Sequence, residues 1–389
     1  MSSSLSFRQW LPVIGITACI FLSNTSEFMP MGLLSIISED LGITPARTGV
    51  VISVYAWVVA IASLPLMLAV CQMEMRKLLL ALIGFFAFSQ FFTAFSSGFY
   101  TLMAARVCVA CCHAILWSIA TPIGARLVPE EHRSKAIGLI VTGASLATIV
   151  GQPLGRTIAL LVGWRMTFAS IGTMALIVLA WLFAALPAIR GEGKFSLADL
   201  PRMLRRKSLL GMFLLALLFS TADFTSFSYF EPFLKDHVHL HPQKITIVLA
   251  LFGIASLAGS AIFSFLYNRF PRMIFNGSIL LLGACQLLIK PLASFPAALV
   301  AVCLLWGICG MLFNVTSQSL TIRFAGATAA PIAMSIYSGI FNVGIGSGTM
   351  FGGILSAHGA LPYIGVAGAI LTALAAIYSI AVFQGALKE

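Results

Sequence analysis

The sequence predicts an all-α membrane protein whose twelve transmembrane helices form two six-helix halves. Hydrophobic residues make up 60% of the 389 residues and charged residues only 9%, whereas soluble domains carry about 25% charged residues. Apolar runs of about 20 residues, long enough to cross a bilayer, follow one another along the chain. The longest and most polar break, residues 190–207, falls after the sixth run and separates two sets of six.

The breaks between apolar runs define the predicted elements. In order, the spans cover residues 10–37, 46–70, 77–96, 99–126, 134–161, 165–187, 208–234, 243–268, 271–291, 294–323, 328–357 and 360–385. The corresponding domains are an N-terminal half (1–187), a cytoplasmic linker (188–207) and a C-terminal half (208–389). The sequence of the linker predicts a short amphipathic helix. Its basic cluster should bind this helix to anionic lipid headgroups. Equal halves are typical of alternating-access transporters built from repeats.

The net charge of +11 is distributed as in a membrane protein rather than a nucleic-acid partner. With a cytoplasmic N-terminus, sixteen of the 23 basic residues lie in cytoplasmic breaks or at the termini, and seven lie elsewhere. This positive-inside bias predicts that both termini are cytoplasmic. The first apolar run is too long for a signal-peptide core and lacks a small-residue cleavage site, so we expect the mature protein to keep it.

Strongly polar residues concentrate in the first, fourth, seventh and tenth spans. These spans carry, in turn, Asn24, Thr25, Ser26 and Glu27; Arg106, His113, Trp117 and Ser118; Thr221, Asp223, Thr225, Ser226, Ser228, Tyr229 and Glu231; and Asn314, Thr316, Ser317, Gln318 and Ser319. Because an ionisable group in hydrocarbon costs at least a few kcal/mol, such residues face a water-filled cavity or one another. The period of three spans therefore predicts four helices that line one solute pathway.

The fifth span contains a stripe of small residues in the sequence GLIVTGASLATIVGQPLG. Gly143, Ala147, Gly151 and Gly155 recur every four residues and share one helix face, which allows close helix packing in a membrane. Pro153 removes a backbone hydrogen bond and bends the helix. The stripe predicts either static packing or an interface that moves during transport, and the polar spans around it favour the moving interface.

Short motifs along nearly the whole chain carry a family resemblance. They are GASLATIVGQPLG in the fifth span, Arg106 in the fourth, PEEHRSKA (129–136) and GWRMTF (163–168). With them the chain resembles the major facilitator superfamily, in its twelve-span drug:proton antiporter branch. NTSEF (24–28), YAWVVA (55–60), HAILWS (113–118), YFEPF (229–233) and SGIFNVGIG (338–346) resemble bacterial sugar-efflux transporters of the arabinose-exporting kind. The resemblance implies the major facilitator fold and places helix 5 against helix 8, which has its own small face around Gly253 and Gly259.

One motif departs from the family pattern. The superfamily's loop 2–3 pattern, G-x-x-x-D-R-x-G-R-[RK], is here roughly AVCQMEMRK. Cys71 stands for the aspartate, Gln72 for the arginine and Glu74 for the glycine. The usual aspartate-based latch between helices 2 and 11 therefore cannot be assumed.

Other residue clusters favour structural roles. Cys108, Cys111 and Cys112 share a helix face, but reduced cysteine behaves as a small buried hydrophobe. The three histidines of residues 237–241 lie in an outer loop without a carboxylate pattern that would fix a metal. The glycines of residues 344–352 imitate a nucleotide-binding loop, but they follow no strand and are better explained by helix packing. Without a P-loop, ATP is not the evident energy source, so we expect no cofactor, no metal site and no enzyme.

The polar spans supply candidates for coupling and for binding. Glu27 and Arg106 lie at comparable depth on two cavity helices, and Asp223 lies near the middle of the seventh span, so these three are the proton-coupling candidates. A change between hydrated and closed surroundings can switch a carboxyl group between its protonated and charged forms. A fixed polar clamp between helices is the alternative. The solute-binding candidates, chosen mainly because amides and imidazoles both donate and accept, are Asn24, His113, Trp117, Tyr229, Glu231, Asn314, Gln318 and Asn342.

The sequence therefore predicts a proton-coupled exporter of sugars or sugar-like solutes, acting as a monomer in the bacterial inner membrane. Its expected partners are the solute, protons and the lipid bilayer, and not nucleic acid. Efflux of drugs, such as chloramphenicol-like compounds, is the alternative within transport, because aromatic residues in the cavity suit a drug as well as a sugar ring. A non-transporting sensor is the alternative of another class, but it would require a large soluble domain that this chain does not contain.

Overall fold

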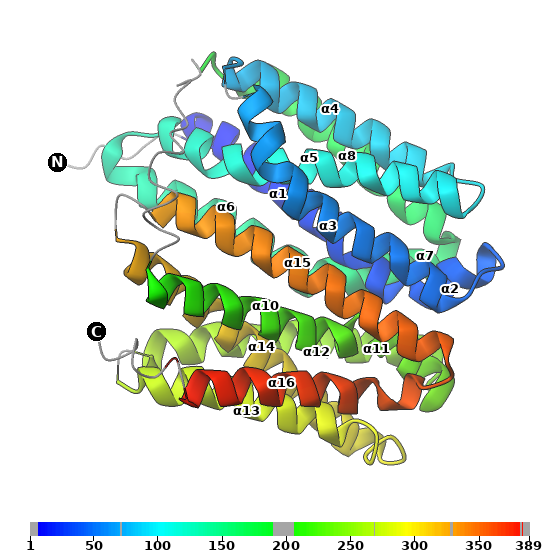
Figure 1. Cartoon of the computed structure of the whole chain (residues 1–389). Coiled ribbons are helices and arrows are strands. Elements are labelled where there is room, and N and C mark those ends of the chain that lie inside the picture. Colours follow the sequence, from blue (N-terminus) through cyan, green and yellow to red (C-terminus); the bar gives the residue numbers. More distant parts are fainter. Residues whose placement is uncertain are drawn as a thin grey trace. The chain divides into compact units, whose positions relative to one another are not determined.

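The computed structural model describes residues 7–70, 72–189, 206–267, 269–326, 330–381 and 383. All regular structure in these residues is helical (Figure 1). Within the described part of the chain, twelve helical segments are long and apolar enough to cross a membrane, and they match the twelve predicted spans one for one. The prediction of an all-α, twelve-span protein is confirmed. The predicted linker helix and Cys71 of the loop 2–3 motif lie outside the described residues.

The helices form two compact units. Unit 1 comprises Met1–Leu33 and Ile61–Phe195, and unit 2 comprises Leu34–Ala60 and Ser196–Glu389. Helix α3 (Pro45–Val70) therefore contributes to both units, because its first part packs with the second half of the chain.

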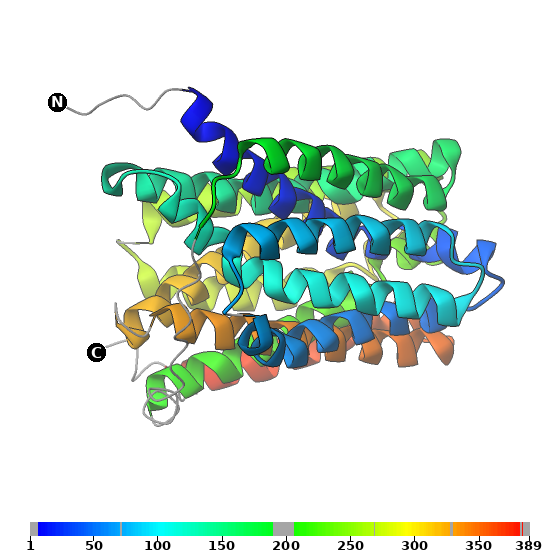
Figure 2. The same cartoon turned by 90° about the horizontal axis from the view of Figure 1, so that it is seen from above.

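Unit 1 holds most of the first six spans. Besides the second part of α3, its elements are α1 (Phe7–Gly32), α4 (Met75–Ala94), α5 (Phe99–Arg126), η1 (Glu130–His132), α6 (Arg133–Leu146), η2 (Ala147–Gly151), α7 (Gln152–Val162) and α8 (Trp164–Ala185). Helices α4 and α5 run antiparallel and are joined by a short turn, and α4 lies along α8 (Figures 1 and 2). In that turn the Thr101 hydroxyl accepts the Gly98 N–H at 3.1 Å, which caps the start of α5.

The fifth span contains a wider turn in its middle. The π-helical turn η2 separates α6 from α7 and ends just before Pro153. Proline has no N–H to donate to the carbonyl group four residues earlier, and its ring crowds that carbonyl. A single π turn accommodates this defect without ending the helix.

Unit 2 holds the second six spans and the segment before Ala60. Besides the first part of α3, its elements are α2 (Leu34–Asp40), α10 (Lys207–Phe227), α11 (Phe230–Pro232), η4 (Phe233–His237), α12 (Pro242–Leu266), α13 (Pro271–Leu288), α14 (Pro296–Ala325), α15 (Ala330–Ala357), η5 (Leu361–Tyr363) and α16 (Ile364–Ala381). Helix α10 lies between α15 and α16 (Figure 1).

The glycines of α15 allow it to approach α10 closely. A Cβ atom placed at Gly352 would lie 2.5 Å from the Thr225 carbonyl oxygen, and one at Gly348 would lie 2.9 Å from the Thr225 nitrogen. Gly346 faces α3, where its Cβ would lie 2.8 Å from the Ser53 carbonyl oxygen. The interpretation of these glycines as helix-packing residues is confirmed.

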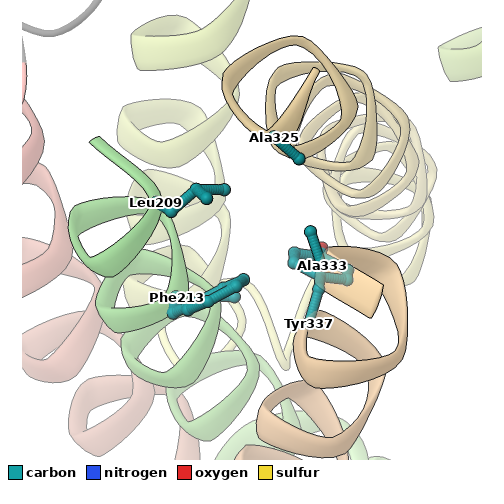
Figure 3. Close-up of a cluster of buried hydrophobic side chains, with 6 residues drawn as sticks. Leu209, Phe213, Ala325, Ala333 and Tyr337 are labelled. Carbon is teal, nitrogen blue, oxygen red and sulfur yellow. The ribbon is translucent and has the colours of Figure 1, made fainter. Parts of the chain in front are cut away.

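An apolar cluster holds one end of α10, α14 and α15 together. Leu209 and Phe213 of α10 face Ala333 and Tyr337 of α15, and Ala325 at the end of α14 completes the cluster (Figure 3). All five side chains are at most 3% exposed. Burial of such residues contributes about 25 cal/mol per Å² of apolar surface that is removed from water.

Large apolar side chains also lie on the outside of the helices. Phe88 is 60% exposed, Leu161 78%, Phe265 83% and Ile377 64%. Exposed apolar surface of this extent is costly in water but not in hydrocarbon, where lipid tails cover it. This distribution agrees with the twelve apolar spans.

Candidate functional site

A buried acidic side chain of α1 pairs with a histidine of α5 in unit 1. Glu27 Oε2 lies 3.4 Å from His113 Nε2, and the two residues are 8% and 2% exposed. The Ser23 hydroxyl lies 2.7 Å from His113 Nδ1. In the tautomer with its proton on Nε2, His113 accepts from Ser23 and directs an N–H towards Glu27. The three residues form a short polar chain that can hold or transfer a proton.

Arg106 lies two helical turns from His113 on α5 and contacts the residue of α1 that precedes Glu27. Its two terminal nitrogens donate to Ser26, one to the hydroxyl at 2.8 Å and one to the carbonyl oxygen at 2.7 Å. Gln90 of α4 donates to the same hydroxyl at 2.7 Å. The ring of Phe168 lies 5.6 Å from the guanidinium carbon and adds a cation–π contact. Arg106 is thus fixed against the residue that precedes Glu27.

Trp117 extends this interface by one helical turn. Its indole N–H donates to Asn24 Oδ1 at 3.1 Å. His113 and Trp117 lie four residues apart on α5, with ring centroids 6.4 Å apart. Of the five α1 and α5 residues that sequence reasoning selected, Asn24, Glu27, His113 and Trp117 therefore meet in one interface, and Arg106 adjoins it.

A second acidic side chain lies in unit 2. Asp223 of α10 accepts the Trp306 indole N–H of α14 at 2.7 Å through its Oδ1. Trp306 is fully buried, and the rings of Phe230 and Phe252 lie 5.3 and 5.8 Å from it. Sequence reasoning did not select Trp306, although a tryptophan in the tenth span is a candidate donor.

The predicted amide residues of unit 2 lie on α14 and α15. Gln318 donates to Asn314 Oδ1 at 2.6 Å along α14, and both side chains are half-buried. Asn342 donates to the Ser338 carbonyl oxygen at 3.0 Å, and its Oδ1 is buried with no hydrogen-bond partner among the described residues. Buried acceptors of this kind normally have a partner, so this one indicates a place for a donor from a ligand or water.

The two remaining binding candidates contact the segment before Ala60. Glu231 Oε2 accepts the Ser35 backbone N–H of α2 at 3.0 Å. The Tyr229 hydroxyl donates to the Ala46 carbonyl oxygen at 3.5 Å, and the tyrosine is fully buried. These contacts hold α2 and the first part of α3 within unit 2, and a solute-binding role for either side chain stays a prediction.

The glycine stripe of the fifth span faces α1. Cβ atoms placed at Gly143 and Gly151 would lie 2.6 Å from the Thr17 carbonyl oxygen and 2.7 Å from Thr25 Oγ1. Gly155 lies against Met29, also on α1. These three glycines pack against α1 inside unit 1, and packing of the fifth span against the eighth span of the other half stays a prediction. A stripe with a four-residue repeat specifies close packing but not which helix supplies the partner face.

The small face of the eighth span packs against α14 inside unit 2. A Cβ atom placed at Gly259 of α12 would lie 2.5 Å from the Ile308 carbonyl oxygen of α14. Conversely, one at Gly307 of α14 would lie 2.6 Å from the Phe252 carbonyl oxygen of α12. Both small-residue faces thus serve close contacts inside their own unit.

Comparison with family models identifies the family. The model described as Major Facilitator Superfamily matches residues 16–230 and 212–386. The chain belongs to the major facilitator superfamily. This major facilitator is a multi-pass membrane transporter rather than an enzyme.

Solved structures show the same fold. A bacterial homologue of the human lysosomal transporter Spinster, in an inward-facing and unoccupied conformation, is 15% identical, with a TM-score of 0.84 over 99% of both chains. A POT family transporter in complex with 5-aminolevulinic acid is 12% identical, with a TM-score of 0.76 over 97% of this chain and 96% of that one. The human organic anion transporter MFSD10 is 16% identical, with a TM-score of 0.69 over 96% of this chain and 100% of that one.

Proposed function

We propose that this major facilitator exports sugars or sugar-like small polar solutes in exchange for protons, as a monomer in the bacterial inner membrane with both termini cytoplasmic. The buried Glu27–His113 pair carries the proposal. An ionised carboxylate away from water costs several kcal/mol unless it is paired and hydrogen-bonded. The charge of Glu27 therefore depends on whether water, His113 or a ligand is beside it.

Such a pair supports exchange of a solute for a proton. In one state Glu27 holds the proton and is neutral in its buried position. When solute binds and rearranges the polar groups of α1 and α5, the proton leaves and the carboxylate is stabilised by the N–H of His113 and the nearby Arg106. The reverse sequence on the other side of the membrane returns the transporter to its first state. A side chain that carried no proton would make solute movement independent of the pH gradient.

The amide groups favour a hydroxyl-rich solute. Asn24, Asn314, Gln318 and Asn342 each offer a donor and an acceptor, and hydroxyl groups of a sugar need both. The bond between Gln318 and Asn314 uses one acceptor and one donor. The Asn314 amide nitrogen and the Gln318 carbonyl oxygen remain for a ligand. The unpartnered Asn342 oxygen adds a further acceptor.

Transport by purified protein in liposomes tests the proposal. We expect an imposed pH gradient to drive sugar accumulation by the wild type and not by Glu27→Gln, which keeps the shape of the side chain but cannot ionise. Glu131→Gln, at an exposed residue of η1, is the matched control and should transport normally. Proton-driven accumulation by Glu27→Gln would refute the coupling role. Accumulation of hydrophobic drugs but of no sugar would instead favour drug efflux.

A further inference from the structure

The two units repeat one hydrogen bond. Gln90 donates to Ser26 Oγ in unit 1 at 2.7 Å, and Gln286 donates to the Ala222 carbonyl oxygen in unit 2 at 3.1 Å. Both bonds join residues 64 positions apart. The two matches of the family model, one to each half, also indicate a repeat. The bonds therefore give a common register for comparing residues of the two units.

In this register the two acidic side chains are counterparts. Glu27 and Asp223 each directly follow the acceptor residue of that bond. Helix α5 faces Glu27 and helix α14 faces Asp223. In the register of the two bonds, counterparts lie 196 positions apart (Ser26 and Ala222, Gln90 and Gln286), so His113 of α5 corresponds to Cys309 of α14. Unit 2 therefore has a cysteine, followed by Gly310, where unit 1 has the histidine that pairs with the acid.

The space beside Gly310 is open. A Cβ atom placed there would lie 4.0 Å from Asp223 Oδ2, and no other described atom lies within 4 Å apart from the two chain neighbours and the α14 backbone. The contact of His113 with Glu27 at 3.4 Å in unit 1 thus has no histidine equivalent on α14. In unit 1 the acidic side chain has a donor in His113. In unit 2 the space beside Gly310 has room for a donor group of a bound solute.

The basic partner is also missing from α14. In the same register Arg106 of α5 corresponds to Val302 of α14. Arg323, near the other end, is the only charged residue in the sequence of α14. The part of α14 that faces Asp223 therefore carries no cation.

Trp306 fixes the direction of the carboxylate. Its N–H holds Asp223 Oδ1 at 2.7 Å, and the surrounding rings of Phe227, Phe230 and Phe252 keep the indole in place. Because Oδ1 is engaged, Oδ2 is the oxygen on the Gly310 side. Trp306 is a positioning residue, since its rings are covered and only its N–H acts on the carboxylate.

We propose that Asp223 Oδ2 accepts hydrogen bonds from hydroxyl groups of the transported sugar, which fills the space beside Gly310. This inference rests on the proposed function and replaces the sequence prediction that Asp223 carries a proton. Hydrogen bonds to an ionised acceptor are roughly twice as strong as those between neutral groups. The two acidic side chains of the repeat thereby have different tasks. Glu27 of unit 1 pairs with His113 and carries the proton, and Asp223 of unit 2 binds the solute.

Sugar binding to Asp223→Asn tests the assignment. Asparagine keeps an oxygen for the Trp306 N–H and replaces Oδ2 with an uncharged amide nitrogen of the same shape, so the variant should fold. We expect calorimetric titration of the full chain in lipid nanodiscs with L-arabinose and D-galactose to show at least tenfold weaker binding. At saturating sugar, the variant should still transport in response to a pH gradient. Unchanged binding, or normal binding with lost response to the pH gradient, would overturn the assignment.

A glycine substitution provides an independent measurement. Gly310→Ala should weaken sugar binding several-fold, because the methyl group takes ligand space without meeting protein. Gly277→Ala is the matched control, since that glycine of α13 has no atom within 4 Å of its Cβ position and lies away from Asp223. Equal sugar binding by the wild type and Gly310→Ala would show that the sugar does not occupy the space beside Gly310.

A deoxy sugar identifies the group that Asp223 binds. A galactose analogue that lacks the hydroxyl group bonded to Asp223 should bind the wild type weakly. The Asp223→Asn substitution should not weaken the binding of this analogue further. If Asp223→Asn instead binds a lipophilic cation, tetraphenylphosphonium, more weakly than the wild type does, the carboxylate binds cations and the hydroxyl assignment is wrong. Absence of all sugar binding to the wild type would count against the proposed function itself.

Discussion

Ser26 is the residue through which the buried Arg106 acts. Both terminal nitrogens of Arg106 donate to it, to the hydroxyl and to the carbonyl oxygen. Because Ser26 is also the neighbour of Glu27 in the chain, the arginine fixes the backbone from which the acidic side chain projects. A planar guanidinium can make such a two-point contact, whereas an ammonium group cannot.

Arg106→Lys tests this two-point contact. We expect loss of one charged hydrogen bond, worth about 1.5–3 kcal/mol, to lower the thermal unfolding midpoint and to reduce pH-driven transport at least tenfold, although the positive charge is retained. Arg133→Lys is the control, because its exposed pair with Glu130 contributes little. Unfolding and transport like those of the wild type would show that charge alone is required at residue 106.

At the residue scale, spacing was enough to select Glu27, His113 and Arg106, because residues seven apart on a helix share a face and depth follows from the rise per residue. It was not enough to select Gln90, which is an isolated amide in an apolar span. A second glutamine at the equivalent place, Gln286, was the signal that the sequence contained. Trp306 was missed for a different reason: its importance depends on its contact with Asp223 across two helices.

At the element scale, run length predicts helices well and helix ends less well. The first span was expected to reach residue 37, but α1 ends at Gly32 and α2 begins at Leu34. Pro30 and Gly32 near the end of α1 account for the break, since both weaken a helix. The seventh span is likewise interrupted after Phe227 and continues beside Pro232. Hydropathy does not detect such breaks, because every residue type in them is compatible with an apolar run.

The glycine stripe allows a graded test of packing between α1 and the fifth span. Gly143→Ala would drive a methyl group against the Thr17 backbone, which cannot move aside, whereas the close contact of Gly155→Ala is with the flexible Met29 side chain, and Thr167 Cγ2 lies at 3.4 Å. Overpacking typically costs about 1–3 kcal/mol. We therefore expect Gly143→Ala to lower the thermal unfolding midpoint clearly more than Gly155→Ala.

Gly138→Ala is the control for that comparison. Its Cβ position has no atom within 4 Å, so the substitution should leave stability unchanged or raise it slightly. Three equally stable alanine variants would mean that the stripe is not closely packed on α1. Because Gly151 lies against Thr25, close to Glu27, substitution there should also disturb transport.

At the scale of the whole molecule, the chain uses one repeat for two tasks. Each unit has a glutamine that bonds to the helix of the acid and an acidic residue directly after the acceptor. The differences lie on the facing helix, where unit 1 has His113 and unit 2 has Cys309 followed by Gly310. This asymmetry could not be derived from composition, because it appears only once the two units are placed in the same register.

Proton release on solute binding tests the exchange of solute for protons most directly. Purified protein in a weakly buffered solution is mixed with saturating sugar, and the change in pH is recorded together with the heat of binding. The account predicts that the wild type releases protons, that Glu27→Gln binds sugar without releasing any, and that Glu131→Gln behaves like the wild type. Saturable sugar binding to the wild type without proton release, or equal release by Glu27→Gln, would contradict it.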